Sequence, residues 1–278
     1  MEEKEIKKVV MKGYAKIAEE AGSCCCVPSC CASTDLAHEI SRKIGYSEEE
    51  LESVPDGADL GLGCGNPIAL ASLKEGETVL DLGSGVGLDC FLAANRVGKN
   101  GKVIGVDMTP EMIEKARENA ERGEYGNVEF RLGEIENLPA GDDSVDVVIS
   151  NCVINLAPDK RKVFREAFRV LKSGGRLMIS DLVLLKELPD FIKNSVEAYV
   201  GCLSGAIMRD EYIAAIKAAG FQDVRIIDEV SFPIDCMIND PTAEAIMENL
   251  EIPPEKVKAI GASIISVKVR GIKPDETA

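Results

Sequence analysis

The chain has 278 residues, and 45% of them are hydrophobic, which is enough for a sizeable core and excludes a globally disordered protein. The formal net charge is −16, with 48 acidic against 32 basic residues, which argues against a nucleic acid as the partner and favours a small-molecule substrate. No apolar run approaches the ~18 residues of a membrane span, and the first residues lack the pattern of a secretory signal. We therefore expect a cytoplasmic protein with no membrane partner.

The N-terminal part, residues 1–67, reads as helices and cysteine-rich loops. Apolar residues recur at helical spacing over 2–20. Short helices are predicted over 34–44 and 47–53, and the second begins with a capping-box pattern. A loop rich in glycine and proline follows and leads to the next part of the chain.

From residue 77 onward strands and helices alternate, which predicts an α/β fold with a doubly wound parallel sheet. The predicted strands are 78–82, 102–106, 128–132, 145–150 and 176–184, and the predicted helices between them are 88–97, 110–122 and 160–171. Glycines at 174 and 175 are expected to stop the last of these helices. This part, residues 68–205, is the expected cofactor-binding domain.

Residues 206–278 have a different pattern. The predicted elements there are a helix over 209–219, strands over 224–227 and 262–269, and short helices over 241–250 and 254–260. This pattern fits either a small C-terminal α+β unit or the last strands of the sheet with an appendage.

A glycine-rich turn, DLGSGVG at 81–87, joins the first predicted strand of the sheet to its first helix. Gly83 and Gly85 allow the backbone to turn sharply and to approach a ligand closely. Asp107 ends the next strand, where a carboxylate can accept both hydroxyls of a ribose. A dinucleotide fingerprint needs a small residue where the bulky Leu88 stands, so a cofactor without a pyrophosphate fits better than NAD.

These motifs resemble the class I S-adenosylmethionine-dependent methyltransferases over about 77–185. The matching segments are VLDLGSG at 79–85, GVDM at 105–108, GEIENLP at 133–139 and LKSGGRL at 171–177. The resemblance implies a Rossmann-like sheet and S-adenosylmethionine as the methyl donor. It places Asp107 on the ribose and Met108 against the adenine face. The residues expected at the cofactor are Asp81, Gly83, Gly85, Asp107, Met108, Glu134, Ile135 and Asn151, with Glu134 and Ile135 at the adenine edge.

The chain has ten cysteines, which in a reducing compartment do not form a disulfide framework. Cys64 and Cys202 are flanked by glycine, and Cys152 follows the fourth predicted strand, so we expect these three in exposed loops. Cys90 lies among apolar residues inside a predicted helix and is expected in the core. The single histidine, His38, lies outside the predicted sheet, so no histidine base is expected at the acceptor site.

Three thiolates beside a methyl donor suggest trivalent arsenic as the methyl acceptor, because thiolates prefer soft centres. The lone pair of trivalent arsenic can attack a methyl group directly, so no general base is needed. Zinc is the alternative ligand. Structural zinc sites usually have four ligands, often in closely spaced cysteine pairs, whereas these three cysteines are far apart in the sequence.

Four segments carry a closer resemblance, to the arsenite methyltransferases, over about 10–230. They are LGCGNP at 62–67, DMTPEM at 107–112, SNCVINL at 150–156 and VGC at 200–202. The resemblance implies that Cys64, Cys152 and Cys202 bind arsenic, and that arsenite and methylarsenite are the substrates. It further implies mono- and dimethylated products, and thus detoxification. The C-terminal unit is expected to contribute to the arsenic site.

The family also has a fourth cysteine near the N-terminus, which forms a disulfide with the residue matching Cys64 during turnover. Glutathione or a thioredoxin-type reductant then resets it. The candidates here are Cys24, Cys25, Cys26, Cys30 and Cys31, of which Cys30 and Cys31 are favoured because they lie nearest to Cys64. Two other functions stay open: a methyltransferase for another small molecule, such as a lipid, a quinone or another metalloid, and a non-catalytic metalloid sensor.

Overall fold

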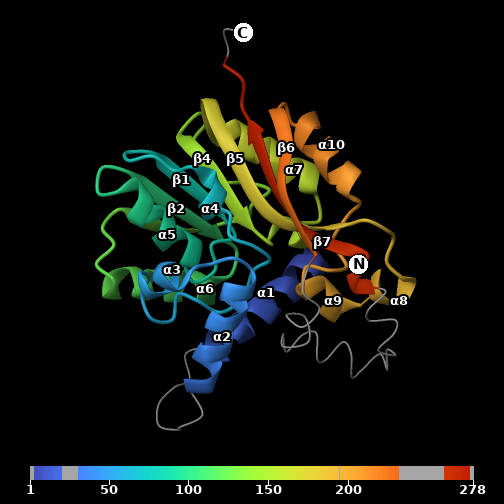
Figure 1. Cartoon of the computed structure of the whole chain (residues 1–278), viewed down its shortest axis with the longest axis horizontal. Helices are drawn as coiled ribbons and strands as arrows, with labels where there is room; N and C mark the ends of the chain where they lie inside the picture. The colour runs from blue at the N-terminus through green and yellow to red at the C-terminus, as the bar shows by residue number, and fades with distance from the viewer. Residues whose placement is uncertain (1–2, 21–30, 194, 232–259, 276–278) are drawn as a thin grey trace.

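The computed structural model describes residues 3–20, 31–193, 195–231 and 260–275. Its centre is a seven-stranded sheet of order β3-β2-β1-β4-β5-β7-β6 (Figure 1). The parallel strands are β1 (Thr78–Leu82), β2 (Lys102–Asp107), β3 (Val128–Leu132), β4 (Val145–Asn151) and β5 (Leu171–Leu184). The last two strands, β6 (Gln222–Ser231) and β7 (Ile264–Ile272), pair with each other, and β7 runs antiparallel to β5. The predicted doubly wound α/β class is confirmed.

Helices cover both faces of the sheet, because successive strand residues point to opposite sides. On one face Leu80 of β1 packs with Phe164 of α7 (Lys160–Val170) and with α10 (Arg209–Ala218). On the other face Val79 of β1 packs with Phe91 of α5 (Leu88–Val97) and with α6 (Pro110–Arg122). The strands are buried on both sides, as expected for a parallel sheet between helices.

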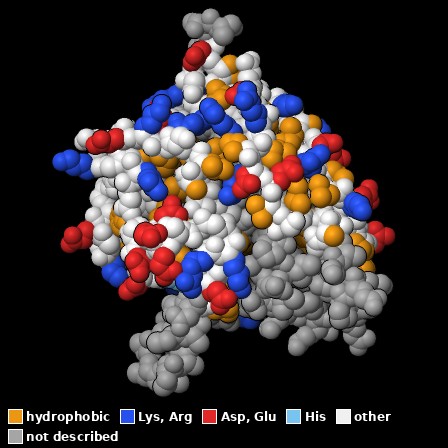
Figure 2. Space-filling view, viewed as in Figure 1, with side chains coloured by type: hydrophobic (Ala, Val, Ile, Leu, Met, Phe, Trp, Pro, Cys, Tyr) orange, Lys and Arg blue, Asp and Glu red, His pale blue; other side chains and the backbone are white. Residues whose placement is uncertain are grey.

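Six further helices, counted over the residues that the structure describes, lie outside the α5, α6, α7 and α10 layers. They are α1 (Glu3–Glu20), α2 (Cys31–Lys43), α3 (Glu48–Glu52), α4 (Ile68–Ala71), α8 (Asp190–Lys193) and α9 (Val196–Val200). Two of them, α3 and α4, add Leu51 and Ile68 to the core that includes Val79. The capping box predicted at the start of α3 is present, with Ser47 and Glu50 bonded reciprocally. Helices α4, α8 and α9 were not predicted. The acidic side chains of α3 form a patch on the face shown in Figure 2.

The end of α7 differs from the prediction. The helix ends at Val170, and strand β5 begins at Leu171 instead of Arg176. The expected glycine turn therefore lies within the strand, because the backbone is already extended at Leu171, which pairs with Val145 across a bulge.

The C-terminal strands extend the same sheet instead of forming a separate one. The predicted helices over 241–250 and 254–260 fall almost entirely outside the described residues. Within the described part of the chain, no helix has the length and apolar character needed to cross a membrane.

Candidate active site

The glycine turn between β1 and α5 has an unusual backbone. Gly83, Gly85 and Gly87 have φ angles of 69°, 51° and 106°, in the left-handed region that glycine adopts without strain. A Cβ atom on Gly85 would meet no other atom within 4 Å, so this glycine faces open space. The turn thus leaves room for a ligand at the carboxyl end of β1.

Asp107 ends β2 beside this turn, as predicted. One of its carboxylate oxygens accepts the Gly85 N–H at 3.0 Å, and the other accepts the Thr109 N–H at 2.9 Å. Burial raises the pKa of Asp107, and these hydrogen bonds oppose that rise. These hydrogen bonds fix the Asp107 carboxylate beside the glycine turn.

Asp81 has a different environment. Its side chain is 2% exposed and accepts a hydrogen bond from the Cys90 thiol at 3.3 Å. Burial, together with the neighbouring Asp89 carboxylate, raises the pKa of Asp81 well above its ordinary value. The structure therefore places the Asp81 carboxyl against α5. Cys90 is fully buried in the core, as predicted.

Helix α1 covers the other end of the expected cofactor site. Lys7 forms ion pairs with Glu134 at 2.7 Å and with Glu136 at 3.0 Å, just after β3. Met108 is half-buried in an apolar cluster that also includes residues of α1, and Ile135 is buried. The expected adenine-side residues thus lie together with α1.

The three predicted ligand cysteines come from separate segments and converge at the carboxyl ends of β4 and β5. Cys64 lies in the loop before α4, Cys152 directly follows β4, and Cys202 follows α9. The sulfur atoms of Cys64 and Cys152 lie within 4.8 Å of each other. The Cys202 thiol donates to the Cys152 carbonyl oxygen at 2.6 Å. The structure therefore brings together residues that are up to 138 positions apart in the sequence.

The expectation that these cysteines lie in exposed loops is wrong for Cys64 and Cys202, which are only 3% and 4% exposed. An apolar cluster encloses them, to which α1 contributes Val10 and the 3-10 turn after β4 contributes Leu156. Burial raises the pKa of the Cys64 thiol. The neighbouring thiols raise the pKa of Cys152 well above its ordinary value, so Cys64 and Cys152 favour the neutral thiol form.

Two of the three cysteines have a strained backbone. Cys152 has a φ of 57° and Cys202 a φ of 61°, in the left-handed region that disfavours residues with a side chain. Such a conformation costs on the order of 1 kcal/mol and persists only where the surroundings enforce it. Here the Cys152 N–H is fixed by the Ser180 carbonyl oxygen at 2.8 Å. Strain at this position indicates that the placement of the thiol matters.

Asn151 connects the Cys64 loop to the sheet. Its side-chain oxygen accepts the Cys64 N–H at 3.1 Å, and its amide group donates to the Gly65 carbonyl oxygen at 2.8 Å. The same amide lies 3.1 Å from the Asp89 carboxylate and 2.8 Å from the Tyr46 hydroxyl. The structure thus places the Asn151 side chain on the Cys64 loop.

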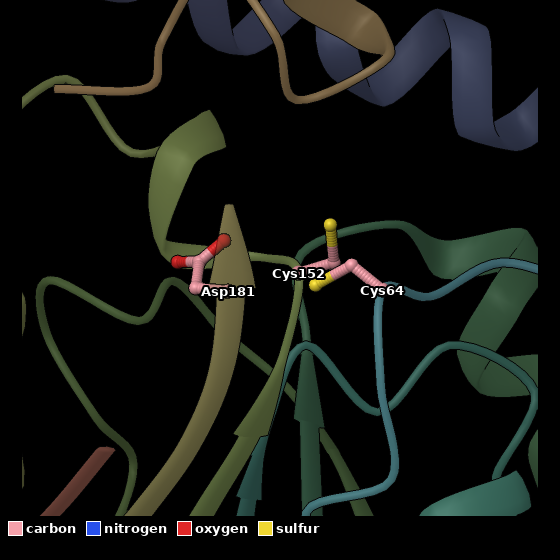
Figure 3. Close-up of side chains that lie close together, drawn as sticks. All are labelled: Cys64, Cys152 and Asp181. Atoms are coloured by element: carbon pink, nitrogen blue, oxygen red, sulfur yellow. The ribbon is translucent and has the colours of Figure 1, made fainter. Parts of the chain in front are cut away.

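Asp181 was not predicted, yet it lies beside the thiols (Figure 3). Asn151 of β4 pairs with Ser180 of β5, so the next residues, Cys152 and Asp181, lie side by side. One carboxylate oxygen of Asp181 and the sulfur atoms of Cys64 and Cys152 all lie within 4.8 Å of one another. Burial raises the pKa of Asp181 to about 7. A single acid inside a strand as apolar as β5 was the available signal, because burying a charge is costly.

Comparison with known proteins identifies the family. Residues 73–224 match the family described as "Methyltransferase domain". An arsenite methyltransferase from Halobacterium salinarum is 51% identical over 80% of this chain and 59% of that protein. The crystal structure of an arsenic(III) S-adenosylmethionine methyltransferase from Chlamydomonas reinhardtii aligns over 85% of this chain and 73% of that one, with 32% identity and a TM-score of 0.61. The chain belongs to the arsenite methyltransferase family.

Two further curated relatives are less similar to the chain. The human arsenite methyltransferase is 41% identical over 59% of this chain and 46% of its own length. A ubiquinone/menaquinone biosynthesis C-methyltransferase from Salmonella arizonae is 34% identical over 48% of this chain and 52% of that protein. The chain thus spans only about half to three-fifths of the length of these curated relatives.

Cys24, Cys25, Cys26, Cys30 and Cys236 lie outside the described residues, and Cys31 is the first residue of α2. The choice of the fourth thiol therefore stays a prediction. His38 lies in α2, with its Nε2 atom 3.9 Å from the Asp59 carboxylate.

Proposed function

We propose that this chain transfers methyl groups from S-adenosylmethionine to trivalent arsenic, which Cys64, Cys152 and Cys202 hold as thiolate ligands. The observation that carries the proposal is the convergence of these thiols next to the glycine turn. Val153, the residue after Cys152, packs its side chain directly against Gly83. An acceptor on the thiols would therefore adjoin a cofactor on the turn.

The glycine turn fits the proposed cofactor. Gly85 faces open space, and the Asp107 carboxylate, fixed beside the turn, would accept the ribose hydroxyls. Met108 would lie against the adenine, with Glu134 and Ile135 at its edge. When bound, S-adenosylmethionine supplies a methyl group on a positively charged sulfur, which is open to attack by a nucleophile. We propose that Asp81 stabilises the glycine turn, because its carboxylate accepts a hydrogen bond from the Cys90 thiol.

The neutral thiols suit arsenite as the substrate. Arsenous acid has three hydroxyl groups, and each can leave as water when a thiol replaces it, so three neutral thiols bind arsenic with no net release of protons. The arsenic lone pair can then attack the methyl group without a general base. This chemistry agrees with the raised pKa values of Cys64 and Cys152.

Methyl transfer formally oxidises the arsenic by two electrons, from the trivalent to the pentavalent state. Formation of a disulfide from two thiols returns these electrons and restores trivalent, methylated arsenic. By the family resemblance, Cys64 would pair with an N-terminal cysteine, with Cys30 or Cys31 favoured. An external thiol reductant, glutathione or a thioredoxin-type protein, would then reduce the disulfide. We place this reaction in the cytoplasm, as arsenic detoxification with mono- and dimethylated products.

The test is to incubate the reduced protein with S-adenosylmethionine, a thiol reductant and arsenite, and then to separate the arsenic species. We expect methylated arsenic with the wild type and with Cys90→Ser, the matched control for a buried thiol outside the cluster. We expect none with Cys152→Ser. Equal product from Cys152→Ser and from the wild type would contradict the proposal.

The similarity to a quinone methyltransferase supports a second candidate, methylation of another small molecule. That function would use the glycine turn and Asp107 but would not need the thiol cluster. Methylation of such an acceptor that survives in the Cys152→Ser and Cys202→Ser variants would favour it.

A further inference from the structure

Asp181 has the surroundings of a metal ligand. It is fully buried, and its carboxylate accepts hydrogen bonds from the Tyr212 hydroxyl, the Asn155 amide and the Leu182 N–H, each at 2.9 Å. Hydrogen bonds of this kind orient carboxylates that bind metals. Their geometry fixes the Asp181 carboxylate at the ends of β4 and β5.

Lys160 interacts electrostatically with this buried carboxylate but forms no direct ion pair with it. Among the described residues no lysine or arginine forms an ion pair with Asp181. Lys160 donates its hydrogen bonds to the carbonyl oxygens of Asn155 and Ala157 instead. The side-chain oxygen of the fully buried Asn155 also has no hydrogen-bond partner. Buried charges are normally paired or coordinate metals, and in the described part of the chain no cation bonds directly to the Asp181 carboxylate.

The donor set specifies the kind of cation. The sulfur atoms of Cys64 and Cys152 and a carboxylate oxygen of Asp181 lie within 4.8 Å of one another. A tetrahedral zinc ion at about 2.3 Å from each sulfur separates two sulfur ligands by about 3.8 Å. The sulfur atoms of Cys64 and Cys152 therefore need to approach each other by at most about 1 Å to bind it. Two thiolates exclude magnesium and calcium, which prefer oxygen ligands.

We propose that Cys64, Cys152 and Asp181 bind a thiophilic divalent cation of the Zn²⁺ class, in a three-ligand site that leaves the fourth position open. The two thiols release their protons to the solvent when the cation binds, so its affinity rises with pH. The cation site rests on the geometry of these three side chains. Its further consequence, that Zn²⁺ competes with arsenite for Cys64 and Cys152, rests on the proposed function.

Asp181 distinguishes the two ligands. Trivalent arsenic takes three thiolates and has no use for a hard carboxylate oxygen, whereas Zn²⁺ takes both sulfur and oxygen. The variant Asp181→Asn should therefore lose the cation and keep arsenite. Asp146→Asn is the matched control, because this aspartate lies at the other end of the sheet and pairs with Lys172.

The experiment is a calorimetric titration of the reduced full chain with Zn²⁺ alone. We expect Asp181→Asn and Cys64→Ser each to bind one equivalent less than the wild type, or to bind that equivalent more than about tenfold more weakly. Asp146→Asn and Cys90→Ser should match the wild type. Because the chain has ten cysteines, zinc bound elsewhere would be common to all variants, and the difference between variants defines the site.

Wild-type stoichiometry and affinity in Asp181→Asn would overturn the proposal. If Asp181→Asn does not fold, Cys64→Ser decides, and full zinc binding by that variant would also overturn it. The titration is then repeated with saturating arsenite, which should abolish the Asp181-dependent equivalent. An equivalent that survives saturating arsenite would support the cation site and contradict the placement of arsenic on these thiols.

Discussion

The two halves of the sheet's carboxyl edge are built differently. At β1 and β2 the glycine turn is open, and one continuous stretch, residues 81–109, supplies its main polar groups. At β4 and β5 the thiol cluster is enclosed under α1 and comes from four separate segments, around Cys64, Cys152, Asp181 and Cys202. An open half suits a cofactor that exchanges in each turnover. In the enclosed half, burial raises the pKa of Cys64 and the neighbouring thiols raise the pKa of Cys152.

The thiol half should show the largest effects. Arsenite has three exchangeable positions, whereas methylarsenite has two, so one thiolate becomes dispensable for the second methylation. We expect Cys152→Ser and Cys202→Ser to lose more than about 100-fold in activity on both substrates. Cys64→Ser should lose activity on arsenite but keep part of it on methylarsenite.

The assay is product formation from each substrate with a strong thiol reductant present, so that disulfide recycling does not limit the rate. Equal losses on both substrates in Cys64→Ser would refute this division of roles. Full arsenite activity in Cys202→Ser would contradict its role as a ligand.

A change in the open half should leave the enclosed half intact. We expect Asp107→Ala to weaken S-adenosylmethionine binding by about 1–3 kcal/mol, because the ribose hydroxyls lose a hydrogen-bond acceptor. Calorimetry measures this loss, with arsenite affinity on the same sample as the control. An unchanged cofactor affinity in the folded variant would contradict the assignment.

Asn151 lies where the two halves meet, so it sharpens the comparison. We expect Asn151→Ala to weaken arsenite binding by about tenfold, because the Cys64 loop loses the hydrogen bonds that position it. Cofactor affinity should change less than arsenite affinity. The reverse pattern, a larger loss for the cofactor, would return Asn151 to the cofactor site predicted from the sequence.

Asp89, the partner of Asn151 on α5, gives a pH dependence. Burial raises its pKa to about 6, so the folded state holds the Asp89 proton more tightly than the unfolded state does. Ionisation between the two pKa values therefore opposes folding, and the free energy of unfolding should fall as the pH rises from about 4 to about 6. Denaturant titrations should show a shallower fall in Asp89→Asn, by on the order of 1 kcal/mol per pH unit. If the free energy of unfolding fell equally steeply with pH in Asp89→Asn and in the wild type, the buried environment of Asp89 would be contradicted.

The smallest effect is expected at Cys90, which belongs to neither half. Its thiol is fully buried in the core and bonded to Asp81. We expect Cys90→Ser to lower stability by about 1 kcal/mol, because a more polar group is buried, while the chemistry of the folded molecules stays unchanged. If this variant lost arsenite binding at unchanged thermal stability, the separation of core from ligand cysteines would be wrong.

The same contrast explains what the sequence could predict. The bounds of β1, α5 and α6 were predicted because local signals set them: an apolar run, a glycine turn, and a proline at the first helical position. The burial of Cys64 and Cys202 depends on the docking of α1, and the place of Asp181 depends on the register between β4 and β5. Neither leaves a local pattern. The insertion of β7 between β5 and β6 is likewise a long-range pairing.

Arsenic X-ray absorption on reduced protein with bound arsenite tests the central claim, that the thiol cluster holds the methyl acceptor. We predict three arsenic–sulfur bonds in the wild type and in Cys90→Ser. In Cys152→Ser we predict that one sulfur is replaced by oxygen or that arsenic no longer binds. The same three-sulfur spectrum from Cys152→Ser and from the wild type would contradict the account, because the arsenic would then be bound elsewhere.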